Sequence, residues 1–202
     1  MDEPGLRERK KQRTRDRIEA VALELFLRDG FDATTVEGIA GAADIAPRTF
    51  FHYFATKEDV VLADYAGRLR RLLEHLAERP SDERSWECLR QAFRAVAAEE
   101  SEQREAMASR LRIMADAPTV AARSLLLQSG WERDLAEVLA TRPAARGRDE
   151  PAPELLAAAA LAAMRASIQQ WLRDPSVDLP VRVDRCFDVL GEGLDRSHRR
   201  RS

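Results

Sequence analysis

Apolar residues recur every three or four positions through most of the chain, which is the spacing of amphipathic helices. The pattern predicts long helices at about residues 10–29, 57–79, 82–100, 102–115, 118–141, 154–173 and 181–195. Two shorter helices are expected between residues 34 and 54. No sustained alternation of apolar and polar residues indicates a strand. We therefore expect an all-α protein of about nine helices.

The two short helices are joined by a tight turn. Thr34 and Glu37 have the spacing of a capping box, in which each side chain satisfies a free backbone N–H of the other residue. Asp44 follows the last apolar position, where the turn requires a residue that tolerates positive φ. Pro47 suits the first turn of the next helix. Helices this short are marginal alone, so longer neighbours must hold them, as in a helix-turn-helix.

The aromatic residues Phe50, Tyr53 and Phe54 can pack the second short helix against the first, and Thr56 and Asp59 form another capping box. Over roughly residues 12–60 these motifs resemble the DNA-binding domain of TetR-type one-component regulators. The resemblance implies a basic arm and helix-turn-helix domain at residues 1–56. It also implies a helical domain for effector binding and dimerisation at residues 57–202.

The resemblance implies that a homodimer places two recognition helices in successive major grooves of double-stranded DNA, over an inverted repeat. Arg48 is the expected base reader, because arginine can grip guanine O6 and N7 together. The remaining expected contacts, to phosphates or to a base, are Thr35, Thr49, His52, Tyr53 and Lys57. The alternatives are a half-buried core ring for Tyr53 and a solvated surface residue for His52.

Three positions depart from the family pattern. Asp44 stands where the turn commonly has glycine, and Ala46 replaces the usual serine cap of the recognition helix. Phe51 replaces a common tyrosine and so lacks a hydroxyl that often contacts phosphate.

Charge is distributed unevenly along the chain. The net charge of −2 combines +5 over residues 5–17 and +4 over residues 196–201, which leaves −11 for the rest. A basic arm on an acidic body limits non-specific adhesion to DNA, and the alternative is a solvated terminus.

The resemblance also implies a small-molecule effector. Apolar candidates for its cavity are Met107, Leu111, Met114, Leu127, Trp131, Met164, Ile168 and Trp171, and each of them is alternatively ordinary core. Arg165 and Gln169 lie one turn apart beside this set and either orient a polar group of the ligand or form a solvated face. The segment from Arg48 to Leu62 is similar to an actinobacterial subgroup that includes the mycofactocin-cluster regulator. The resemblance to this subgroup implies acyl-CoA ligands.

The last two predicted helices suit a dimer interface. Alanines at 157–160, 162 and 163 allow close helix approach, although alanine is also simply a good helix former. The resemblance favours an interface formed by Leu161, Val183, Phe187, Leu190 and Leu194.

Other function classes lack their motifs. There is no Gly-rich phosphate loop, no nucleophile motif and no metal-spaced cluster of His and Cys, so we expect no enzyme, cofactor or metal. No apolar run is long enough to span a membrane, and we expect a cytoplasmic protein. The alternatives, both without a small-molecule effector, are a redox-sensing regulator that uses Cys88 or Cys186 and a helical scaffold that has lost DNA binding.

Overall fold

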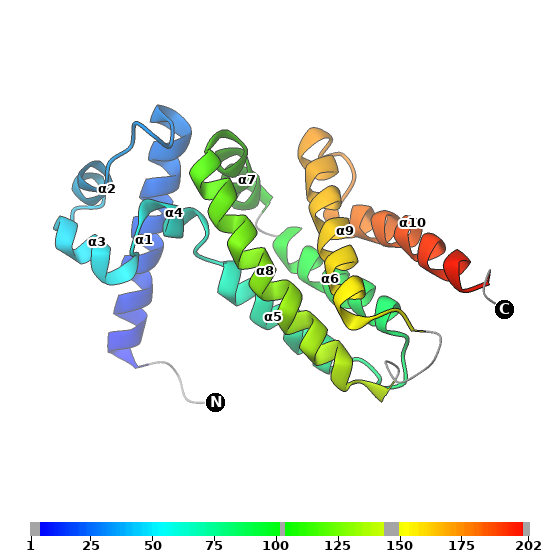
Figure 1. The fold of residues 1–202 in the computed structure, drawn as a ribbon. Helices are drawn as coiled ribbons and strands as arrows, with labels where there is room; N and C mark the ends of the chain where they lie inside the picture. The colour runs from blue at the N-terminus through cyan, green and yellow to red at the C-terminus, as the bar shows by residue number, and fades with distance from the viewer. Residues whose placement is uncertain (1–4, 102–103, 144–149, 200–202) are drawn as a thin grey trace. The chain divides into compact units, whose positions relative to one another are not determined.

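The computed structural model describes residues 5–101, 104–143 and 150–199, with backbone only for residues 8, 100, 101 and 193–199. Every regular element in this part of the chain is a helix (Figure 1). The helices are α1 (Leu6–Asp29), α2 (Val36–Ala42), α3 (Pro47–Tyr53), α4 (Lys57–Val61), α5 (Tyr65–Ala77), α6 (Ser85–Ser101), α7 (Arg104–Asp116), α8 (Pro118–Thr141), α9 (Pro153–Arg173) and α10 (Leu179–Arg199). The all-α prediction is confirmed.

The helix predicted over residues 57–79 is divided in the structure into α4 and α5. Val60, Val61 and Leu62 are all buried, and three successive residues cannot face one side of a continuous helix. The chain therefore turns after Val61 and resumes its helical course at Tyr65. A second difference is that α1 begins at Leu6 rather than near Lys10, because its first turns are helical without an apolar face to reveal them.

The chain divides into two compact units. The first comprises residues 1–63 and 105–124, and the second comprises residues 64–104 and 125–202. The sequence placed a domain boundary at residue 56, whereas the structure places α4 and most of α7 in the same unit as α1, α2 and α3.

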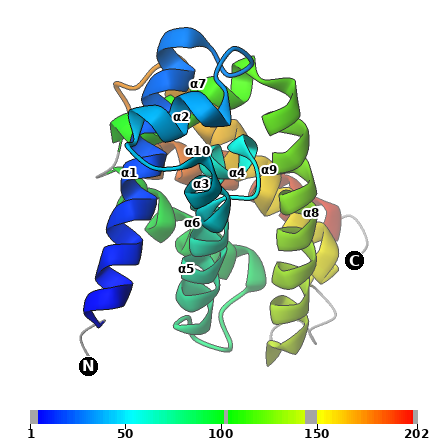
Figure 2. The same cartoon turned by 90° about the vertical axis from the view of Figure 1, so that its left-hand side faces the viewer.

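The first unit is built around α1. Ile18 and Phe26 of α1, Ile39 of α2 and Phe50 of α3 are buried together with Val60 of α4. Helices α2 and α3 pack against each other and α2 packs on α1; both short helices face the viewer in Figure 2. Since neither has enough residues to be stable alone, this shared core holds them in place.

Two ion pairs join α1 and α4 to the later helices of this unit. Arg110 of α7 donates to the carboxylate of Glu19 on α1. Arg123 of α8 lies 2.6 Å from Oδ1 of Asp59 on α4. The other oxygen of Asp59 accepts the backbone N–H of Thr56 at 3.0 Å, which confirms the predicted capping box at the start of α4.

The second unit packs α6 against α5, α9 and α10. The ring of Phe187 on α10 lies between Trp86 and Phe93 of α6, with centroid distances of 4.8 and 5.7 Å. The indole N–H of Trp86 donates to the carbonyl of Phe187 at 3.1 Å. Gly191 permits this close approach, because a Cβ there would lie 2.7 Å from Nε1 of Trp86. None of the described helices has the length and apolar character needed to cross a membrane.

Candidate DNA-binding site

Helix α2 is capped one residue later than the sequence predicts. Thr35, not Thr34, is the N-cap, and its hydroxyl accepts the backbone N–H of Gly38 at 3.0 Å. The prediction of a capping box between Thr34 and Glu37 is therefore wrong. The buried hydroxyl of Thr34 instead donates to the carbonyl of Gly30 at 2.8 Å and closes the turn that follows α1. Thr35 remains exposed, so its hydroxyl hydrogen is available to an outside acceptor.

The turn between α2 and α3 follows the sequence prediction. Asp44 has a φ of 51°, in the left-handed region that aspartate tolerates better than most residues. Pro47 stands in the first turn of α3 and Ala46 caps it without a side-chain hydrogen bond. The rings of Phe50 and Phe54 are buried and hold the inner face of α3 against the core, as the sequence indicates.

The opposite face of α3 is open to solvent. Arg48, Phe51 and His52 are exposed and have the i, i+3, i+4 spacing of one helix face. Among the described residues, none forms a hydrogen bond or ion pair with the Arg48 guanidinium. Thr49 and Tyr53 are half-buried beside this face, and the Tyr53 ring meets the His52 ring edge-on at 5.3 Å. The sequence did not place Phe51 among the contacts, although its spacing from Arg48 gives it the same exposed side.

Lys57 has an internal role that differs from the predicted phosphate contact. Its ammonium donates to the carbonyls of Phe31 at 2.7 Å and Thr34 at 3.1 Å, with that of Asp32 at 3.5 Å. It also lies 4.4 Å from the centre of the Phe31 ring. Its three donors are thus directed to the turn that precedes α2, and we assign Lys57 to the stability of the module.

Replacing Lys57 by methionine is expected to lower the free energy of unfolding by about 1.5–3 kcal/mol, the range for hydrogen bonds that involve a charged group. The reason is that the carbonyls of the 31–34 turn lose their shared donor. Urea unfolding followed by circular dichroism measures the change. The matched control is Lys11→Met on the exposed surface of α1, and an equal effect of both variants would contradict the assignment.

The basic N-terminal segment belongs to α1 from residue 6 onward, so it is not a separate arm there. Arg7, Lys10, Lys11 and Arg13 are exposed along its first turns. Arg15 instead donates to the carbonyl of Ala63 at 3.4 Å and lies 5.1 Å from the centre of the Phe54 ring. In addition to the exposed face of α3, the first unit thus carries several exposed cations along the first turns of α1, which suit a polyanion.

The residues predicted to line an effector cavity belong to both units. Met107, Leu111 and Met114 lie in the first unit, and the others lie in the second. Trp131 is half-buried with its ring 5.3 Å from that of Tyr65. Met164 and Ile168 of α9 are also half-buried, Leu127 is exposed, and Trp171 is buried with Arg104 over its ring.

The two polar candidates are exposed in this chain. Arg165 donates to the side chain of Gln128 at 3.4 Å, which links α9 to α8. Gln169 is exposed one turn further along α9. Their side chains are thus accessible, and an orienting role toward a ligand stays a prediction.

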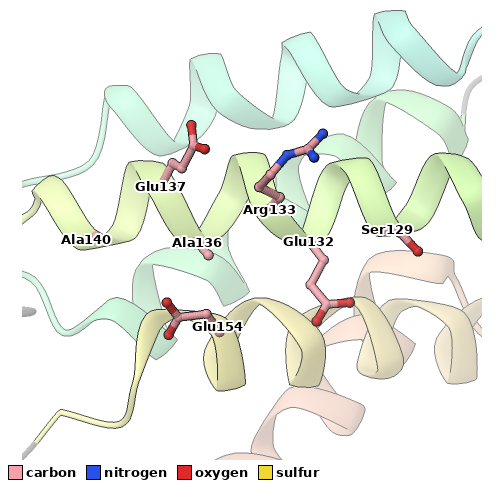
Figure 3. A pocket seen from close by; sticks show the side chains of 7 residues that line it. All are labelled: Ser129, Glu132, Arg133, Ala136, Glu137, Ala140 and Glu154. Carbon is pink, nitrogen blue, oxygen red and sulfur yellow. The ribbon is translucent and has the colours of Figure 1, made fainter.

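An open cleft of about 650 Å³ lies between the second half of α8 and the start of α9 (Figure 3). Glu132, Glu137 and Glu154 line it with a single cation, Arg133. None of the predicted effector residues lines this cleft. Its acidic character disfavours an anionic ligand.

Two predicted dimer residues are interior residues of the chain itself. Val183 and Phe187 are 0% exposed, and Phe187 is enclosed by Trp86 and Phe93. The prediction for these two is wrong, because a side chain without accessible surface cannot contact a second copy. Leu161 is half-buried and Leu190 is 37% exposed. The side chain of Leu194 lies outside the described residues.

The two cysteines do not resemble a redox sensor. Cys88 is buried, and burial raises the pKa of its thiol, which disfavours the reactive thiolate. Cys186 is partly exposed and lies 3.6 Å from the side-chain nitrogen of Gln170. No group of three or more potential metal ligands occurs within the described ranges.

The sequence matches two protein families over most of its length. Residues 18–63 match the family described as bacterial regulatory proteins, tetR family, and residues 83–195 match the MftR C-terminal domain. The first match covers the second half of α1 and all of α2, α3 and α4. The second covers more than half of the chain.

Two relatives align along almost the whole chain. A Mycobacterium tuberculosis (strain ATCC 25618 / H37Rv) protein that carries the name mycofactocin biosynthesis transcriptional regulator MftR is 32% identical over 188 residues, which are 93% of this chain and 94% of the relative. The HTH-type transcriptional regulator TcmR of Streptomyces glaucescens is 35% identical over 182 residues, 87% of this chain and 80% of the relative.

A solved structure shares the fold. Thermus thermophilus FadR, a TetR family transcriptional repressor in complex with lauroyl-CoA, is 25% identical with a TM-score of 0.58. The likeness covers 89% of this chain and 94% of FadR.

Proposed function

The chain belongs to the TetR family of bacterial transcriptional regulators, and from this premise we propose that it is a homodimeric repressor that a small-molecule effector releases from its operator. Its relatives regulate transcription, so the chain is a regulator and not an enzyme.

The exposed face of α3 carries the proposal. Arg48 is unpaired among the described residues, and its guanidinium is free to form two hydrogen bonds to guanine. His52 and the half-buried Thr49 and Tyr53 flank it with groups that can reach phosphates and so position the helix. Thr35 adds a hydroxyl at the start of α2. This set combines one residue that reads a base with several residues that contact phosphates and position the helix.

A two-fold dimer would present two such helices about 34–36 Å apart, so the operator is an inverted repeat. The second unit supports such a dimer, because α9 and α10 expose apolar side chains. These are Leu155, Val181, Val189 and Leu190. The half-buried alanines of α9, Ala158, Ala159 and Ala162, are small enough to let a second copy approach closely.

For the effector we propose an acyl-CoA or a similar amphipathic acyl compound. FadR, which shares the fold, is bound to lauroyl-CoA. In this chain the half-buried apolar residues Trp131, Met164 and Ile168 suit an acyl chain. Arg165 supplies a cation for phosphate or carboxylate on the same helix as Met164. The acidic cleft between α8 and α9 is not part of this site.

The test is binding of the purified dimer to the intergenic DNA upstream of its own gene at several salt concentrations. We expect the logarithm of the binding constant to fall linearly with the logarithm of the salt concentration, since each phosphate contact releases counterions. If a folded dimer binds neither this region nor any fragment in a genome-wide selection, the scaffold alternative replaces the repressor.

The effector is tested on the protein–operator complex with acyl-CoA esters of increasing chain length and with free CoA as the control. An effector should weaken operator binding by an amount that corresponds to a coupling of about 1–3 kcal/mol. An ester that binds the protein but leaves operator affinity unchanged is not the effector.

A further inference from the structure

Phe51 lies on the solvent-exposed face of α3 and not on the face that packs into the core. It is 56% exposed, whereas Phe50 is 0% exposed and Phe54 is 3% exposed. Its neighbours on the exposed face are Arg48, three residues earlier, and His52. The fold of the unit therefore gives no interior partner for most of this ring, and leaving a large apolar surface in water is unfavourable.

The ring of Phe51 is nevertheless held in a defined direction. It meets the ring of Phe50 edge-on, with centroids 5.5 Å apart and planes at 87°. Because Phe50 is fixed in the core, this contact steadies the inner edge of the Phe51 ring and leaves its outer part exposed. An apolar group presented in this way between two basic side chains suits a polyanionic partner with an apolar spot.

The major groove of DNA offers one such spot. Among the base edges there, thymine alone presents a methyl group, at C5, and phenylalanine contacts it favourably. We propose that Phe51 reads a thymine in each operator half-site through this methyl group. The inference rests on the proposed function, and it adds a specificity residue that forms no hydrogen bond.

The position of this thymine relative to the guanine of Arg48 follows from helix geometry. Three residues advance about 4.5 Å along a helix, and stacked base pairs are about 3.4 Å apart. The thymine therefore lies one or two base pairs from the guanine that Arg48 contacts. The expected half-site contains G and T as neighbours or with one base pair between them.

The experiment replaces each thymine of the selected operator, in both half-sites together, by deoxyuridine, which lacks only the C5 methyl group. Wild-type protein should lose about fourfold in affinity per half-site at one thymine, or roughly fifteenfold for the symmetric pair, the effect of one apolar carbon lost from each contact. Phe51→Ala should bind the thymine operator more weakly and show no difference between thymine and deoxyuridine there. Phe51→Tyr, which keeps the ring, should retain the discrimination and is the matched control.

The outcomes separate this inference from the proposed function. If no genomic DNA binds, the proposed function fails first. If the operator binds and Arg48→Ala weakens it, but no thymine shows a methyl effect that depends on Phe51, the inference is overturned. A methyl effect of equal size in wild type and Phe51→Ala overturns it as well. Because Phe51 is largely exposed, we expect the variants to fold, and unfolding curves check this.

Discussion

The Arg48→Ala variant is expected to bind the operator about a hundredfold more weakly than wild type, with an unchanged fold. A two-pronged arginine–guanine contact contributes about 1–3 kcal/mol of discrimination, and each 1.4 kcal/mol is about tenfold in affinity. The dimer makes this contact twice. Fluorescence anisotropy with a labelled operator at fixed salt measures the change.

Two controls define the origin of this loss. Arg48→Lys keeps the charge but not the planar fork, so it should recover part of the affinity and little of the preference for guanine. Arg173→Ala removes an exposed arginine from the end of α9 and should leave operator affinity unchanged. Equal losses on operator and random DNA in Arg48→Ala would mean that Arg48 contacts only phosphate.

Local sequence signals predicted the DNA-binding face well where one residue determines the local structure. Asp44 adopts the positive φ that the turn requires, Pro47 begins α3, and the capping box of Thr56 and Asp59 is present. Phe50 and Phe54 are buried as their spacing indicates. These features are short-range, so a few neighbouring residues contain the information.

Features that depend on contacts between distant residues were not predictable in the same way. The ammonium of Lys57 is held by carbonyls more than twenty residues earlier, which no local motif records. The spacing of Thr34 from Glu37 predicts that Thr34 caps α2. Its hydroxyl instead closes the turn after α1. The Lys57 ammonium thus has a tertiary role, whereas the Thr34 hydroxyl has a different local role from the predicted one.

The amphipathic pattern shows that a helix has an apolar face, but it does not show which neighbouring element covers that face. Val183 and Phe187 have the spacing expected for an interface, yet the aromatic side chains of α6 enclose Phe187. The same limit applies to α7, which the sequence assigned to the effector domain. It shares a unit with the helix-turn-helix, through partners that are about ninety residues apart in the chain.

The ion pair between Arg110 and Glu19 is one of those long-range links and should have the largest effect on stability. The two side chains are 13% and 18% exposed, and burial lowers the pKa of the Arg110 guanidinium. Its Nε has no hydrogen-bond partner among the described residues. Without Glu19 the buried cation would lose its carboxylate partner.

We expect Glu19→Leu and Arg110→Met each to lower the free energy of unfolding by about 3–5 kcal/mol, because each leaves one buried charge uncompensated. The double variant should recover most of that loss, since two apolar side chains of similar size replace the pair without leaving a charge behind. Urea unfolding of the four proteins gives this cycle. Glu74→Gln, which removes the carboxylate of an exposed ion pair with Arg70, is the control and should cost about 0.5 kcal/mol or less. If the double variant is as unstable as the sum of the single ones, Arg110 and Glu19 act independently, and α7 is joined to α1 by packing rather than by charge.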